Sequence, residues 1–207
     1  MDLQFYGANC LSLTHKSTRI LIDDNLADLG SKSVTKNDDV SLFTSAHSDA
    51  KGRISFDGPG EYEVADVSII GIPARAHVDE PKTLAATMFK MVVGDLTILV
   101  TGHIYPELSE SQLERIGMID VLVVPVGGNG YTLDPVGALK LIKLIEPKLV
   151  VPTHYADKAL NFAVPQQELK NALTEIGMEP KETVSKLKAK PNELSDVTQL
   201  VILEKSY

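Results

Sequence analysis

Short apolar runs separated by polar turns fill the first part of the chain, a pattern typical of β-strands. The chain opens on two extended stretches with Gly7 and Asn9 between them, which predicts a hairpin. The polar stretch 24–39 is expected to form a loop, with its most flexible part at 30–37. Further strands are expected at 19–23, 40–44 and 67–72.

The second half adds helices to this pattern. Gly94 and Asp95 separate two apolar runs and predict a hairpin turn. Ser109, followed three residues later by Gln112, predicts the capped start of a short helix. In full, we expect strands at 87–93, 96–101, 121–126, 149–151 and 198–203, and helices at 109–116, 134–145 and 166–176.

Strands precede and alternate with helices in both halves, so we expect an α+β fold of two facing mixed sheets with helices on the outer faces. The length of 207 residues predicts a single domain, 1–207, with pseudo-symmetric halves at about 1–84 and 85–207.

Composition narrows the functional classes. The net charge of -8 and the pI of about 5.1 argue against binding nucleic acid or anionic lipid through overall charge. Cys10 is the single cysteine, so no intrachain disulfide can form. No apolar run approaches the roughly eighteen residues of a membrane span, and the first residues carry no secretory signal. We therefore expect a cytoplasmic protein without a membrane partner.

The most informative segment is 43–50, Phe-Thr-Ser-Ala-His-Ser-Asp-Ala, at the end of an expected strand. A strand end is a rigid place from which to project metal ligands. The segment resembles the Thr-His-x-His-x-Asp-His signature of the metallo-β-lactamase superfamily. Ser45 and Ala50 stand in place of the first and last His, so the motif is degenerate.

Three further segments support this resemblance: 57–63, 125–132 and 146–155. Together they resemble the small bacterial "MBL-fold metallo-hydrolase" group related to ascorbate-6-phosphate lactonase. The resemblance covers essentially the whole chain and implies an αββα sandwich with the site at one edge, between the sheets. It does not specify a substrate, because this fold hosts many hydrolases and some proteins that are not enzymes.

The resemblance also implies a set of metal ligands. His47 and Asp49 match the second His and the Asp of the motif, and His154 matches the C-terminal His of the family. His77 lies one position from the family's loop His. His103 replaces the Asp that bridges two metals in the family.

A neutral imidazole cannot bridge two cations, so we expect at most one metal ion: Zn²⁺, with Mn²⁺ or Fe²⁺ as alternatives, or none. His47, His77 and His103 form one candidate ligand set; Asp49, His103 and His154 form another. Asp49 would be the catalytic residue that orients or deprotonates the metal-bound water. The reaction would be hydrolysis of an ester, lactone or phosphoester.

Other interpretations stay open for these residues. His47 could be a buried His bonded to backbone, Asp49 could cap a turn, and His103 could stack on Tyr105. His77 could be a surface residue. A Ser45 nucleophile with a His base lacks the strained turn that such nucleophiles need.

Two functional classes remain. The clustering of His residues favours a metal-dependent hydrolase acting on a small molecule, which is the interpretation we prefer. The losses at Ser45 and Ala50 favour a catalytically inactive relative that binds a ligand or self-associates as a homo-oligomer.

A nuclease is a weaker third class, because the chain is acidic. The resemblance implies that the glycine-rich stretch 127–130 shapes the rim of the site. We expect 61–63 to be a solvated turn.

Overall fold

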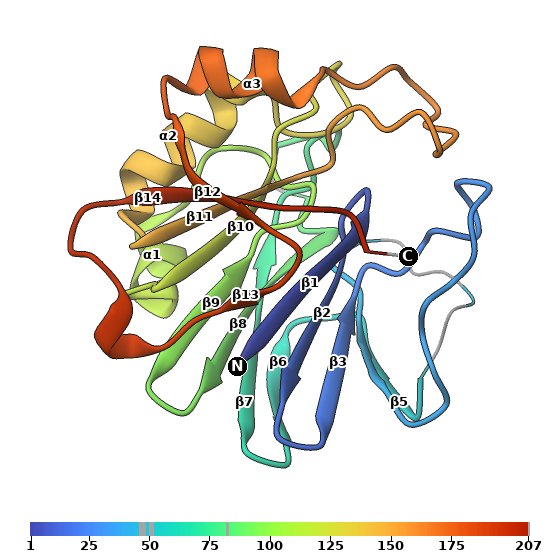
Figure 1. Cartoon of the computed structure of the whole chain (residues 1–207), viewed down its shortest axis with the longest axis vertical. Coiled ribbons are helices and arrows are strands. Elements are labelled where there is room, and N and C mark those ends of the chain that lie inside the picture. The colour runs from blue at the N-terminus through green and yellow to red at the C-terminus, as the bar shows by residue number, and fades with distance from the viewer. Residues whose placement is uncertain (46–48, 50–51, 82, 207) are drawn as a thin grey trace.

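The computed structural model describes residues 1–45, 49, 52–81 and 83–206, and within them two sheets face each other (Figure 1). The six-stranded sheet has the order β13-β1-β2-β3-β4-β5. Strands β1, β2 and β3 are antiparallel, and β4 and β5 join them in parallel, so the sheet is mixed. Its strands are β13 (Leu187–Lys188), β1 (Asp2–Gly7), β2 (Cys10–His15), β3 (Thr18–Ile22), β4 (Val40–Leu42) and β5 (Ile54–Phe56).

The eight-stranded sheet has the order β12-β14-β11-β10-β9-β8-β7-β6. From β12 to β9 each strand is parallel to its neighbours in this order. From β9 to β6 neighbouring strands are antiparallel, so this sheet is mixed too. Its strands are β12 (Pro180–Val184), β14 (Gln199–Leu203), β11 (Leu149–Thr153), β10 (Val121–Pro125), β9 (Leu96–Val100), β8 (Ala86–Val93), β7 (Val67–Ala74) and β6 (Gly60–Val64).

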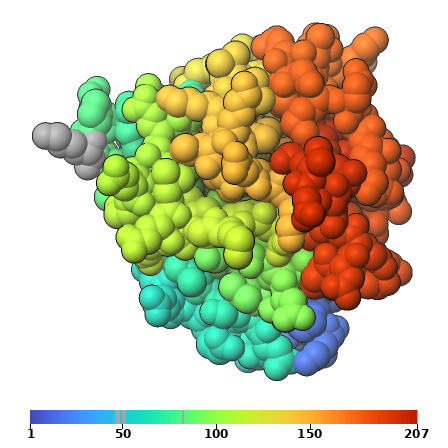
Figure 2. All heavy atoms as spheres, turned by 90° about the vertical axis from the view of Figure 1, so that its left-hand side faces the viewer, coloured from blue at the N-terminus to red at the C-terminus, as the bar shows by residue number. Residues whose placement is uncertain are grey.

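Three helices cover the outer face of the eight-stranded sheet: α1 (Glu110–Ile116), α2 (Pro135–Ile145) and α3 (Leu169–Ile176). Figure 2 shows this helical face, on which the three helices lie side by side. The expected capping box is present, because Ser109 accepts from the backbone of Gln112 and the Gln112 side chain bonds back. A short 3₁₀ turn, η1 (Pro191–Glu193), precedes β14. In the part of the chain that the structure describes, no helix is long and apolar enough to cross a membrane.

Two apolar layers hold the fold together. The larger lies between the sheets and includes Leu11, Ile22 and Leu42 from one sheet and Phe89 and Val123 from the other, all 3% exposed or less. The second joins the eight-stranded sheet to the helices. The expected α+β sandwich of two mixed sheets is therefore confirmed.

Loops, in the described residues, cover the outer face of the six-stranded sheet. Leu26 and Leu160 from two loops pack on Cys10 and Leu21 there. The Asp24 carboxylate fixes the first loop by accepting from the backbone nitrogens of residues 34 and 35, at 2.8 Å each. Cys10 is a buried core thiol, and burial raises its pKa well above the ordinary value.

Two local expectations are wrong. Residues 61–63 belong to strand β6 rather than a turn, because the glutamates alternate outward while Val64 and the half-buried Tyr62 pack inward. The helix expected from 166 begins only at Leu169. Residues 166 and 167 stay extended because the backbone of Gln167 exchanges hydrogen bonds with Gly127 and Ala156.

Candidate functional site

Strand ends from both sheets meet at one edge of the sandwich. Asn9 lies in the β1–β2 turn and Asp23 directly follows β3. Thr44 follows β4, His103 follows β9, and His154 follows β11. Because each residue leaves a paired strand, its backbone is held by the sheet.

A buried anchor links two of these strand ends. The Asp23 carboxylate accepts hydrogen bonds from the Thr44 backbone nitrogen at 2.7 Å and from its hydroxyl at 2.6 Å. Gly102, at φ 62°, packs so tightly on Thr44 that a Cβ atom would overlap its side chain. Burial raises the pKa of Asp23 to about 6. The anchor fixes the position of the residue next to Gly102, which is His103.

His103 is held by a two-step hydrogen-bond relay. The Thr153 hydroxyl donates to Asn9 Oδ1 at 2.9 Å, and Asn9 Nδ2 lies 2.9 Å from His103 Nε2. The other ring nitrogen of His103, Nδ1, is buried and has no hydrogen-bond partner among the described residues. Burial, with His154 and His77 nearby, lowers the pKa of His103 to about 3, so its ring is neutral at pH 7.

His154 is held through its opposite ring nitrogen. Gln166 Nε2 donates to the Val164 carbonyl at 2.9 Å, which leaves Gln166 Oε1 to accept from His154 Nδ1 at 3.2 Å. The proton on Nδ1 leaves the lone pair on Nε2 free to bind another group. Burial lowers the pKa of His154 to about 4.

The backbone of His154 adopts a conformation that non-glycine residues rarely take, with φ of 51°. Its nitrogen donates to the Ala8 carbonyl at 2.8 Å. Gly127 lies directly against it, and a Cβ atom there would overlap the His154 carbonyl and the Gln166 side chain. Gly127, at the start of the glycine-rich stretch, therefore borders the site, as the family resemblance implies.

The two imidazoles meet edge to face, with ring centroids 4.4 Å apart. His77 lies beside them, because its backbone nitrogen donates to the His103 carbonyl at 2.8 Å. His77 Nδ1 is also buried without a hydrogen-bond partner in the described residues. The Tyr105 ring contacts the Arg75 guanidinium, 3.9 Å from its centroid, and the His77 ring, whose centroid lies 6.1 Å away, rather than His103.

The first motif is only partly described. His47 and Ala50 lie outside the described residues. Ser45 lines a small cavity of about 20 Å³ together with Asp23, Asn9 and His103. Asp49 is exposed, and it is not brought to His103 and His154 as a ligand set. Its metal-binding and catalytic roles stay predictions.

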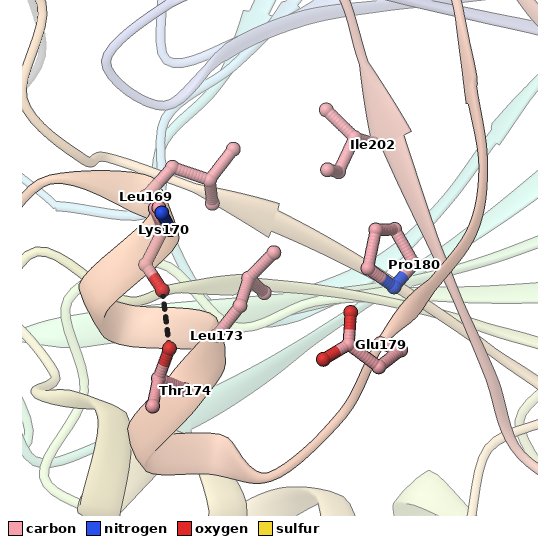
Figure 3. Close-up of a pocket in the computed structure, with 7 residues that line it drawn as sticks. All are labelled: Leu169, Lys170, Leu173, Thr174, Glu179, Pro180 and Ile202. Atoms are coloured by element: carbon pink, nitrogen blue, oxygen red, sulfur yellow. Dashed lines mark hydrogen bonds between the residues drawn. The ribbon is translucent and has the colours of Figure 1, made fainter.

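A hollow of about 200 Å³ opens next to the imidazoles. Its lining residues are Leu29, His103, Tyr131, His154, Phe162, Ala163, Val164 and Gln166. A larger groove of about 470 Å³ lies elsewhere, between α3 and strands β12 and β14 (Figure 3). Leu169 and Leu173 point into that groove, which has no His or Cys in its lining. The candidate ligands His103 and His154 line the smaller hollow and not the larger groove.

The ring nitrogens at this edge are of a chemical type that binds metals. His103 and His77 each carry a buried ring nitrogen without a partner, and His154 presents a free Nε2. Neutral imidazoles are common zinc ligands, and a second bond at the far nitrogen is usual for them. Among the described residues, however, no three His, Cys, Asp or Glu side chains are grouped closely enough to hold a metal by themselves. A complete site therefore needs a ligand from the segment around His47 or a small rotation of the rings.

Comparison with known proteins places this chain in a family. The model of the β-lactamase superfamily domain matches residues 2–154, which contain all five candidate ligands. This chain belongs to the β-lactamase superfamily. Its fold also matches a Thermotoga maritima protein assigned as a zinc-dependent hydrolase of the metallo-β-lactamase superfamily. That match has a TM-score of 0.74, 26% identity and 98% coverage of both chains.

Curated members of the superfamily are similar as well. A UPF0173 protein of Pyrococcus abyssi is 24% identical over 184 residues, which cover 75% of this chain and 83% of the relative. A UPF0173 metal-dependent hydrolase of Carboxydothermus hydrogenoformans is 39% identical over 67 residues. That match spans 32% of this chain and 29% of the relative. The superfamily expected from the motifs is confirmed, and several of the similar proteins are named metal-dependent hydrolases.

Three supporting residues escaped the sequence analysis: Asn9, Thr153 and Gln166. Asn9 contacts a side chain 94 residues away, and Gln166 contacts one 12 residues away. The only signal in the sequence was the Pro-Thr-His context of Thr153, which adjoins a predicted ligand.

Proposed function

We propose that this protein is a metal-dependent hydrolase with a reduced site that holds a single metal ion. The observation that carries the proposal is the pair His103 and His154. These are two neutral imidazoles 4.4 Å apart, each bound by a side chain at one ring nitrogen. Such bonds fix the ring and its tautomer in metal sites.

In this proposal His154 Nε2 and His103 Nδ1 hold the metal, and His77 or His47 completes the set. When bound, the metal supplies a Lewis acid and a water whose pKa is lowered toward about 7. Zn²⁺ suits these nitrogen ligands, and Mn²⁺ or Fe²⁺ are the alternatives to be tested.

The side chains around the two imidazoles determine which ring nitrogens carry protons. Gln166 keeps the proton of His154 on Nδ1. For His103 Nδ1 to offer a lone pair, Nε2 must carry the proton, and Asn9 can accept it if its amide turns over. Thr153 can follow this turn, because a hydroxyl both donates and accepts. Asp49 would then hold or remove the proton of the attacking water.

The substrate in this proposal is a small ester, lactone or phosphoester that enters the 200 Å³ hollow. The buried free Cys10 agrees with a cytoplasmic setting, which is part of the proposal. A homo-oligomer is also part of the proposal.

The test is hydrolysis of p-nitrophenyl acetate and bis-p-nitrophenyl phosphate by chelator-treated protein, before and after addition of Zn²⁺, Mn²⁺ or Fe²⁺. We expect activity only with metal, and its loss in His154→Ala. His15→Ala is the matched control, because His15 ends β2 and was the one His not assigned to the site. Equal rates in His154→Ala and His15→Ala would contradict the proposal.

The second candidate is an inactive relative that binds a ligand in the same hollow. The observation in its favour is the lack of a complete three-ligand group in the described part of the chain. Metal-independent ligand binding, without hydrolysis of either substrate, would favour it.

A further inference from the structure

The hollow beside His103 and His154 has a distinctive wall. Leu29, Ala163, Val164 and the ring of Phe162 make it apolar, and Tyr131 stands at its rim, 62% exposed. Gln166 and the two imidazoles provide polar atoms that lie together at one side of the cavity because they contact one another. Away from these groups and the Tyr131 hydroxyl, the lining side chains of the hollow are apolar.

No charged side chain lines this hollow among the described residues. The adjacent hollow, which shares Phe162 and Gln166 with it, is lined by Lys158 and Asp157. Lys205 lies near that second hollow, but its ammonium is bound to the Asp157 carboxylate at 2.7 Å. Phosphate sites in proteins normally use Arg, Lys or backbone N–H groups at a helix N-terminus. The lining of this hollow contains no such cation, and the exposed Lys158 belongs to the neighbouring hollow only.

We propose that the hollow receives the neutral acyl part of a small carboxylic ester or lactone, with Phe162 and Tyr131 as specificity-determining residues. Phosphoesters are then poor substrates. This inference rests on the proposed hydrolase function for the identity of the reacting bond, but the preference for a neutral group rests on the wall alone.

Size and desolvation both support a compact neutral group. Drug-sized ligands occupy pockets of about 300–1,000 Å³, so a hollow of 200 Å³ suits a group of only a few carbon atoms. An anion placed against Phe162 and Val164 would lose water without gaining a cation, which is unfavourable. An acyl chain or lactone ring gains from the same contact by leaving water.

Phe162 lies where it would contact this group and limit its size and shape. Its ring centroid lies 5.0 Å from that of His154, so it borders both the imidazole and the cavity. A group seated in the hollow against the His154 ring therefore packs on Phe162. Tyr131 borders the same cavity from the loop before α2 and can cover the bound group.

The test compares two probes without a hydrolysable bond, cyclopentanone and cyclopentylphosphonate, titrated into the protein and followed by NMR. It is run on protein as purified and after metal removal, because a metal would attract the phosphonate by itself. Without metal, we expect cyclopentanone to bind at least tenfold more tightly than the phosphonate. Phe162→Ala and Tyr131→Ala should each weaken binding of the ketone fivefold or more.

Two controls keep the result specific. Met118→Ala removes a side chain that is 92% exposed and is not part of this hollow, so it should change binding less than twofold. Phe162→Leu keeps an apolar wall and should retain most of the affinity. Tighter phosphonate binding without metal, or ketone binding unchanged in both Phe162→Ala and Tyr131→Ala, would overturn the inference.

The outcomes separate this inference from the proposed function. Ketone binding that depends on Phe162, without hydrolysis of any ester in the presence of metal, supports the assignment of the hollow and refutes the hydrolase. Hydrolysis of phosphodiesters faster than of carboxylic esters supports the hydrolase and refutes the neutral acyl group.

Discussion

The ring of His103 meets the ring of His154 edge to face, at an interplanar angle of 88°. The two residues come from different strand ends, after β9 and β11, and each is bonded by its own amide side chain. Burial keeps both rings neutral at pH 7. His154 can then offer Nε2 to a metal, and His103 can offer Nδ1 once Asn9 accepts the proton on Nε2. The proposed metal site depends on this pair and on the residues that hold its rings.

Gln166 should matter for metal binding because it fixes the tautomer of His154. Gln166→Ala is expected to weaken zinc affinity about 10–100-fold. The measurement is competition with a chromophoric chelator. Gln167→Ala is the matched control, because the Gln167 side chain bonds Glu175 and not the imidazole. Equal affinities in the two variants would contradict this role.

Asn9 should tune His103 through the relay from Thr153. Asn9→Asp places an acceptor at Nε2, which keeps the proton there and leaves Nδ1 free for the metal. We expect zinc affinity to rise, and to fall about tenfold in Asn9→Ala. The ¹⁵N chemical shifts of the His103 ring report the tautomer directly. In metal-free protein, where Asn9 Nδ2 lies against Nε2, a His103 ring with the same tautomer in wild type and Asn9→Asp would refute the relay.

Gly102 should be intolerant of any side chain because of Thr44. Gly102→Ala is expected to destabilise the protein by about 2 kcal/mol more than Gly94→Ala. The control is closely matched, since the φ angles are 62° and 59° and only Gly102 has a neighbour within 4 Å. Chemical denaturation measures the difference. Equal losses in the two variants would show that Thr44 can move away.

Asp23 should give stability a specific pH dependence. Its pKa is raised from 3.8 to about 6 in the fold, so the folded state binds this proton more tightly than the unfolded state. The contribution is fully present below about pH 4 and is lost as the pH rises through about 6. An Asn does not titrate: its Oδ1 can accept from the Thr44 nitrogen, and its Nδ2 can donate to the Thr44 hydroxyl once that hydroxyl turns.

The measurement for Asp23 is the free energy of unfolding of metal-free wild type and Asp23→Asn from pH 4 to 7. We expect the stability of wild type relative to the variant to fall by about 3 kcal/mol as the pH rises over this range. A difference in the free energy of unfolding between the two proteins that does not change with pH would mean that folding does not raise the pKa of Asp23.

Local signals predicted much of the fold. Ser109 with Gln112 gave the start of α1, and Gly94 with Asp95 gave the β8–β9 turn, because both depend on neighbours in sequence. Strands β12 and β13 were not expected. Residues 180–184 lack apolar alternation, and they are ordered as an edge strand by backbone pairing with β14.

The candidate site was harder to predict for the same physical reason. The ligand types could be expected from a motif, but their supports come from distant loops. His77 joins His103 through backbone pairing between Ala76 and Ile104, which no local pattern reveals. Gln166 leaves the expected helix to bond His154, so tertiary contacts overrode local helix preference there.

The most direct test of the account is the metal content of purified, untagged protein, measured by mass spectrometry as moles of metal per mole of chain. The account predicts a value near one for wild type and for His15→Ala, and a value near zero for His154→Ala. A wild-type value that stays near zero after incubation with Zn²⁺, Mn²⁺ and Fe²⁺ would contradict the single-metal site.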